Sequence, residues 1–285
     1  GNSITTTNWN GNDGGIVALE VNGNLTLNGT ITATGNGFRG GALDPNSLTA
    51  GGSPTDIRRL GSFNDFEGSE KGEGIGGFYA EYDAVFSRYG IGAPANGGGG
   101  GGYQNAGGGG GSNVVVGGAY TSKGNPQGFS AVWDLEAAGF GGSTSAGGGR
   151  GGYAISDVDQ NELVVGPANA AWGGDDRKNT GGFGGHPLPF VADRLFAGGG
   201  GGAGDQDSDE GGAGGSGGGI VLIQAYGTVT GSGLIDAQGA AGQNTNPNNN
   251  APTGGTPRRG VDGAGGGGAG AVSYTHLRAH ETACY

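Results

Sequence analysis

The chain has 285 residues, of which 77 are glycine, and its formal net charge is −12 at pH 7. This acidic balance disfavours nucleic acids and anionic membranes as partners, because both carry negative charge. No apolar run approaches the ~20 residues that a membrane-spanning helix needs, so we expect no membrane span in this chain.

The first predicted elements lie in residues 14–37, which read GGIVALEVNGNLTLNGTITATGNG. The run Ile16–Val21 is almost continuously apolar, which is typical of a strand buried on both faces. Two alternating segments follow, around residues 25–27 and 31–33, and each predicts a short strand with one face inward. Asn-Gly and Gly recur at six-residue spacing, as in two-residue hairpins or in the coils of a β-solenoid. Of these two we favour the solenoid.

The middle of the chain has a different composition. Residues 42–96 predict a loop-rich insertion, and residues 97–217 predict a glycine-rich segment with nearly pure glycine runs. Such runs form flexible linkers, or extended polyglycine-II-like strands that only glycine allows to approach closely. Aromatic residues near the runs favour the ordered alternative. These residues are Tyr103, Phe140, Tyr153, Trp172, Phe183 and Phe196.

The last part of the chain repeats the first. Residues 218–241 match residues 14–37 at a constant offset of 204, with aliphatic and glycine positions both kept. The domain organisation we predict is therefore a first β-repeat unit at 1–41 and a second at 218–271, the latter with an exposed loop at 244–259. The predicted fold class is all-β, with β-solenoid or β-helix-like repeats and polyglycine-II-like segments.

Residues 272–285 form a tail that differs from everything before it. Glycine stops at Gly270, and residues 272–282 resemble one translated reading frame of a transposase adapter used in sequencing libraries. We therefore interpret 272–285 as non-native and leave it out of the functional argument. The natural chain is expected to continue beyond residue 271, with a further aliphatic strand next.

One acidic loop is a candidate metal site. Residues 205–210 read DQDSDE in a glycine-rich stretch and carry four carboxylates, those of Asp205, Asp207, Asp209 and Glu210. Ca²⁺ takes six to eight oxygen ligands, so alternating carboxylates in such a loop can bind it. The spacing does not fit an EF-hand, because position six is Glu210 instead of glycine. The sequence thus predicts a possible Ca²⁺ site and no other cofactor.

Several glycine-rich phrases occur in a fixed order, among them GEGIGG at 72–77, LFAGGGGGAGD at 195–205 and DGAGGGGAGAV at 262–272. They resemble large glycine-rich, adhesin-like proteins of bacterial surfaces. The resemblance implies an exported protein at the cell surface or outside the cell, with further repeats or a sorting domain downstream.

The function we predict is a structural or adhesive module without catalysis, with glycans or other surface components as partners. Tyr79, Tyr82 and Tyr103 are the predicted aromatic contacts. One alternative is a glycoside hydrolase or polysaccharide lyase on a β-solenoid, although no spacing singles out a pair of catalytic carboxylates. A second alternative is an ice- or surface-binding repeat. Its threonine array would comprise Thr26, Thr30, Thr32 and Thr34, of which the second copy keeps only Thr230 in register with Thr26.

Overall fold

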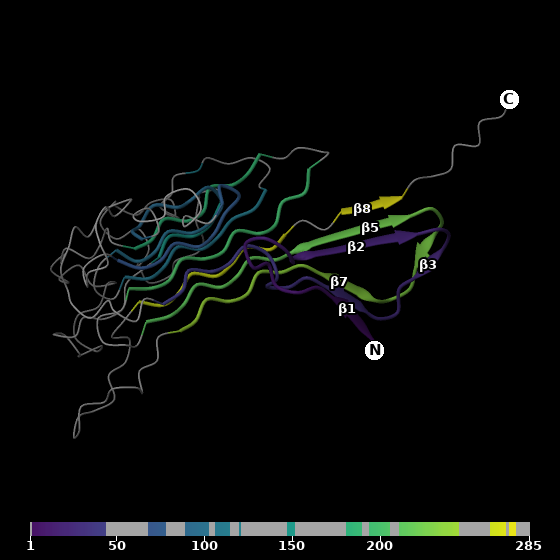
Figure 1. The fold of residues 1–285 in the computed structure, drawn as a ribbon, viewed down its shortest axis with the longest axis horizontal. Coiled ribbons are helices and arrows are strands. Elements are labelled where there is room, and N and C mark those ends of the chain that lie inside the picture. Colours follow the sequence, from purple (N-terminus) through teal and green to yellow (C-terminus); the bar gives the residue numbers. More distant parts are fainter. Residues whose placement is uncertain are drawn as a thin grey trace, which may run out of the picture.

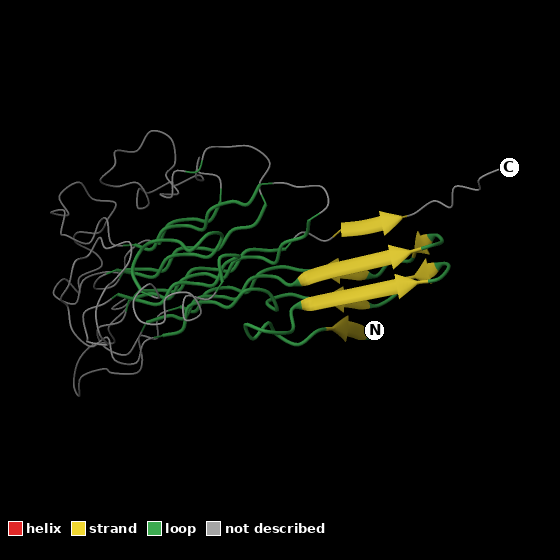
Figure 2. Ribbon diagram, turned by 45° about the horizontal axis from the view of Figure 1, so that its top comes forward, coloured by secondary structure: helices red, strands yellow, loops and turns green. Residues whose placement is uncertain are grey.

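The computed structural model describes residues 2–43, 68–77, 89–102, 106–114, 120, 147–151, 181–189, 194–205, 211–244, 263–271 and 274–277. These ranges contain no helix, and every strand in them pairs in parallel with another strand. The all-β prediction is therefore confirmed for this part of the chain. The strands gather at one end, and extended segments rich in glycine lead away from them (Figures 1 and 2).

Eight short strands form three small sheets within the described ranges. They are β1 (Ser3–Thr5), β2 (Ile16–Val21), β3 (Leu25–Thr26), β4 (Thr30–Thr32), β5 (Ile220–Ala225), β6 (Val229–Thr230), β7 (Leu234–Asp236) and β8 (Tyr274–Leu277). The sheets have the orders β1-β4-β7, β2-β5-β8 and β3-β6. Both copies of the sequence repeat thus contribute three strands each, as predicted.

The two copies lie on top of each other in register. Ile16 pairs with Ile220, Leu25 with Val229 and Thr30 with Leu234, so all three strand pairs keep the offset of 204 found in the sequence. Strands β2, β3 and β4 of the first copy pair with β5, β6 and β7 of the second, and none of these six strands pairs with another strand of its own copy, so the hairpin alternative is wrong. Stacking in this register places Val17 beside Val221 and Ile31 beside Ile235, and so aligns the apolar interior of one copy with that of the next.

The strand stack is buried on its inner side only. Val17 is 5% exposed, whereas its neighbour Ile16 is 54% exposed, so the prediction that β2 is buried on both faces is wrong. Flanking strands cover a stacked strand along its edges, but they leave its outer face to solvent. The buried core of the stack consists of Val17, Ile31, Ala33, Val221, Ile223 and Ala237.

The glycine-rich segments are joined by backbone hydrogen bonds that repeat every third residue. Segment 198–205 shows the pattern most completely, with donor–acceptor distances of 2.8–3.0 Å. Its first, fourth and seventh N–H groups bond to segment 211–219, and its second, fifth and eighth to segment 106–112. The third and sixth bond to segment 69–73. An extended chain with three residues per turn directs successive N–H groups in three directions, as this pattern requires.

The carbonyl groups of segment 198–205 complete its surroundings. They accept N–H groups from segments 37–41, 97–102 and 263–271. Each of the six neighbouring segments is also hydrogen-bonded to the next, so that together they close a ring around segment 198–205. We call these seven segments the glycine bundle. One of them, 69–73, lies inside the region predicted as a loop-rich insertion, and its Glu70 and Glu73 are buried.

Close approach explains why glycine fills the glycine bundle. A Cβ atom added to Gly201 would lie 2.0 Å from the carbonyl oxygen of Gly266, and one added to Gly202 would lie 2.0 Å from that of Gly99. Real Cβ atoms essentially never come within 3.0 Å of such an atom. The segments are therefore spaced too closely for side chains on their facing sides.

The C-terminal strand β8 occupies the position at which the sequence predicts a further strand. It pairs in parallel with β5, with Leu222 opposite Tyr274 and Ala225 opposite Leu277. These residues belong to the tail interpreted as non-native. The free edge of β5 thus accepts a strand that shares no repeat pattern with it.

Candidate binding pocket

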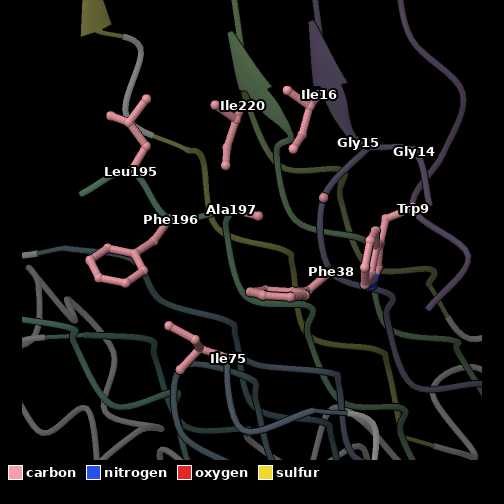
Figure 3. Close-up of a pocket in the computed structure, with 11 residues that line it drawn as sticks. Trp9, Gly14, Gly15, Ile16, Phe38, Ile75, Leu195, Phe196, Ala197 and Ile220 are labelled. Carbon is pink, nitrogen blue, oxygen red and sulfur yellow. The ribbon is translucent and has the colours of Figure 1, made fainter. Parts of the chain in front are cut away.

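An apolar pocket of about 230 Å³ lies where the strand stack meets the glycine bundle. Three aromatic side chains border it, those of Trp9, Phe38 and Phe196 (Figure 3). The remaining wall is aliphatic and consists mainly of Ile16, Ile75, Leu195 and Ile220. These side chains surround one space, so a ligand in the pocket would contact aromatic rings and branched aliphatic groups (Figure 3).

The fold brings these residues together from distant parts of the chain. Ile16 and Ile220 are the first residues of β2 and β5, and the register of the repeat places them side by side. Phe38 follows β4 in the chain, and Phe196 precedes segment 198–205, which lies at the centre of the glycine bundle. The pocket therefore exists only when both the strand stack and the glycine bundle are formed.

Trp9 is held in place by contacts on several sides. Its indole Nε1 donates to Oε1 of Glu73 at 3.0 Å, and its backbone N–H donates to the carbonyl of Asn36 at 3.0 Å. Its ring meets Phe38 edge to face, with centroids 6.4 Å apart and an interplanar angle of 85°. This is a favourable aromatic geometry, so both rings are fixed before any ligand arrives.

Glu73 lies behind Trp9 and is itself fully engaged. Its side chain is only 2% exposed, and its Oε2 accepts from Nε of Arg39 at 3.0 Å. The backbone N–H of Arg39 donates to the same oxygen at 3.0 Å, and Nη1 of Arg39 donates to the carbonyl of Asn10 at 2.9 Å. A buried carboxylate is tolerated when charged and hydrogen-bonded partners replace water in this way.

Asn96 joins two walls of the pocket. Its side chain is fully buried, and its Oδ1 accepts from the backbone N–H of Ile75 at 2.7 Å. Its Nδ2 donates to the carbonyls of Ser112 at 3.1 Å and Ala197 at 3.3 Å. One amide thereby fixes the backbone at Ile75 and at Ala197.

We expect Asn96→Ala to lower the free energy of unfolding by about 2 kcal/mol, because it removes a buried amide that accepts from the N–H of Ile75 and donates to the carbonyl of Ala197. The carbonyl of Ser112 keeps the N–H of Gly199 as its donor. Chemical denaturation followed by tryptophan fluorescence measures this loss. Asn12→Ala is a control at an exposed asparagine and is expected to change stability by less than about 0.5 kcal/mol. Equal stability of the two variants would contradict the role assigned to Asn96.

The predicted Ca²⁺ ligands are described only in part. Asp205 is buried at the end of the central segment, where its backbone N–H donates to Ala106 and its carbonyl accepts from Gly263. Asp207, Asp209 and Glu210 lie outside the described residues. In the ranges given above, no three His, Cys, Asp or Glu side chains gather as a metal site. Calcium binding stays a prediction.

The other predicted contact residues have mixed outcomes. Tyr79, Tyr82 and Tyr103 lie outside the described residues. Thr26 and Thr230 are in register, with their Oγ1 atoms 3.5 Å apart, as the repeat predicts. In the neighbouring sheet, however, Thr30 lies opposite Leu234 and Thr32 opposite Asp236. The second copy therefore interrupts both of those threonine rows.

No protein-family model, curated protein or solved structure matches the chain significantly. In the part that the structure describes, no helix is long and apolar enough to cross a membrane. The binding chemistry of the pocket therefore follows from its own residues. Those that are described as lining it include no carboxylate, histidine or hydroxyl side chain, so they favour binding of an apolar group.

Proposed function

We propose that the chain is a structural or adhesive module of an exported bacterial surface protein, without catalysis. The ring of six segments around segment 198–205 is the observation that supports this proposal most directly. A backbone bonded to neighbours in six directions resists bending and local opening, and local opening is what a protease requires. The negative net charge favours solubility of such a rod outside the cell.

Within this proposal, the glycine bundle is a polyglycine-II-like assembly and the strands are coils of a β-solenoid. The three-residue hydrogen-bond period supports the first assignment. Parallel, in-register stacking of the two copies supports the second. The module then holds the exposed loop predicted at 244–259 on a stiff support, from which this loop contacts glycans or other surface components.

The proposal is tested by limited proteolysis combined with binding to a glycan panel and to polysaccharide-coated surfaces. We expect cleavage only outside the seven segments of the glycine bundle, with saturable binding to at least one surface and no turnover of polysaccharide. Rapid cleavage within segment 198–205 would exclude a rigid module. Polysaccharide turnover that one carboxylate substitution abolishes would favour the glycosidase or lyase alternative.

The solenoid assignment makes a separate prediction about the free edges of β2 and β3. A hollow beside them is lined by Leu19, Leu25, Leu27 and Ile31, and β1 pairs with β4 at an offset of 27 residues. Because Ser3 pairs with Thr30, position 1 corresponds to position 28 of the first copy. A variant in which a copy of residues 14–28 replaces Gly1 would therefore carry two further strands, positioned to pair with β2 and β3. We expect it to raise the melting temperature by about 4 °C or more, since each kcal/mol gives roughly 2–4 °C in a chain of this size. A prefix with the same residues in scrambled order is the control, and equal melting temperatures would contradict the assignment.

A further inference from the structure

We propose that the pocket bordered by Trp9, Phe38 and Phe196 binds a small aromatic compound of one ring or two fused rings. This assignment goes beyond a structural or adhesive role, because it names a ligand class and a site. It depends on the pocket alone, and it holds whether or not the chain adheres to a surface.

The size of the pocket sets the size of the ligand. Its volume is about 230 Å³. An apolar cavity of about 150 Å³ accommodates benzene, so the pocket has room for one ring or for two fused rings of indole size. A longer ligand would extend out of the opening and gain little further contact.

The chemistry of the wall selects an aromatic ligand over a sugar. The lining residues that the structure describes offer three rings and several aliphatic side chains. Their one polar side-chain group is the indole N–H of Trp9, which donates to Glu73. A sugar ring in this space would leave most of its hydroxyl groups without hydrogen-bond partners, which costs free energy. An aromatic ring instead gains edge-to-face or offset contacts with Phe38 and Phe196 in addition to the burial of its surface.

The walls of the pocket are fixed in advance by polar groups behind them. Glu73 holds Trp9, and Asn96 holds the backbone of Ile75 and Ala197. Asn113 donates through Nδ2 to the carbonyl of Phe196 at 3.3 Å and to that of Gly270 at 2.8 Å. A ligand therefore meets a preorganised site and does not have to order it, which favours affinity for a small molecule.

Titration of the full chain with indole, followed by two-dimensional ¹H–¹⁵N NMR, tests the assignment. The Nε1–H signal of Trp9, identified by its loss in Trp9→Phe, is expected to shift saturably with a Kd of about 0.1–1 mM. Methyl β-glucoside at the same concentrations is expected to leave the signal unchanged. Absence of a saturable shift with indole would overturn the proposal, as would an equal response to the glucoside. Tighter binding of N-acetyltryptophanamide than of indole would overturn the assignment to a free small compound.

Two variants locate the binding at the pocket. Phe196→Leu keeps most of the side-chain volume but removes the ring, and it is expected to weaken indole binding about tenfold or more. Ile16→Glu places a charge at the rim on a side chain that is already 54% exposed, so the fold is expected to remain intact while binding falls at least as far. Tyr226→Leu, at an exposed tyrosine just after β5, is the control and is expected to bind like the unmodified chain. Unchanged affinity in either pocket variant, with an unchanged melting temperature, would overturn the proposal.

Discussion

Replacement of Gly266 by alanine is expected to destabilise the protein severely. A Cβ atom at this position would lie 2.1 Å from the carbonyl oxygen of Gly109 and 2.4 Å from its carbonyl carbon. Both are backbone atoms, so they cannot rotate away as a flexible side chain would. Overpacking of a core costs about 1–3 kcal/mol, and we expect Gly266→Ala to reach or exceed the upper end of this range. Thermal and chemical unfolding measure the loss.

The adjacent residue provides a matched control. A Cβ atom on Gly267 would have its nearest heavy-atom neighbour 3.8 Å away, and this position is exposed to solvent. Gly267→Ala is therefore expected to cause no loss of stability, and the reduced entropy of its unfolded chain favours a gain of about 0.4–1 kcal/mol. Equal destabilisation by the two substitutions would show that close approach does not explain the glycine content.

Removal of the Glu73 carboxylate is expected to have the second large effect. Glu73→Ala would remove the carboxylate that accepts from Nε of Arg39 and from the indole N–H of Trp9, while Nη1 of Arg39 keeps the carbonyl of Asn10 as an acceptor. Breaking a buried ion pair in this way costs about 3–5 kcal/mol, and we expect the lower end because the Arg39 side chain is 31% exposed. Glu73→Gln keeps the volume and one acceptor, so its loss of stability is expected to be smaller.

Glu20 is the control for Glu73. Its carboxylate is exposed on β2 and accepts a hydrogen bond from the hydroxyl of Tyr226 at 3.0 Å. Glu20→Ala is expected to change the free energy of unfolding by no more than about 0.5 kcal/mol, because water replaces the lost contact. If urea titration gives the same loss for Glu20→Ala and Glu73→Ala, the buried ion pair does not stabilise the pocket.

The strand stack could be predicted from the sequence because its signal is local and duplicated. The offset of 204 and the three apolar segments of each copy determine both the strands and their register. The burial of β2 was not predictable from its composition. A nearly continuous apolar run is compatible with one buried face or two, and only the stacking geometry leaves Ile16 exposed.

The glycine bundle and the pocket were harder to predict, for different reasons. Glycine runs carry no side chains to specify partners, so nothing in residues 198–205 identifies their six neighbours. Trp9 and Phe38 belong to no motif, and the fold brings them next to Ile75 and Phe196 from remote positions. The one useful signal was Phe196, an aromatic residue directly before a glycine run. Its neighbours become apparent only once the segments are assembled.

Amide hydrogen exchange in segment 198–205 tests the central claim most directly. Every N–H group in this segment donates to another segment of the glycine bundle. We therefore expect protection comparable to that of the core strand β5, with exchange limited by cooperative opening of the bundle. Exchange at the rate of an unstructured glycine-rich peptide, while β5 remains protected, would contradict an ordered glycine bundle and the rigid module that depends on it.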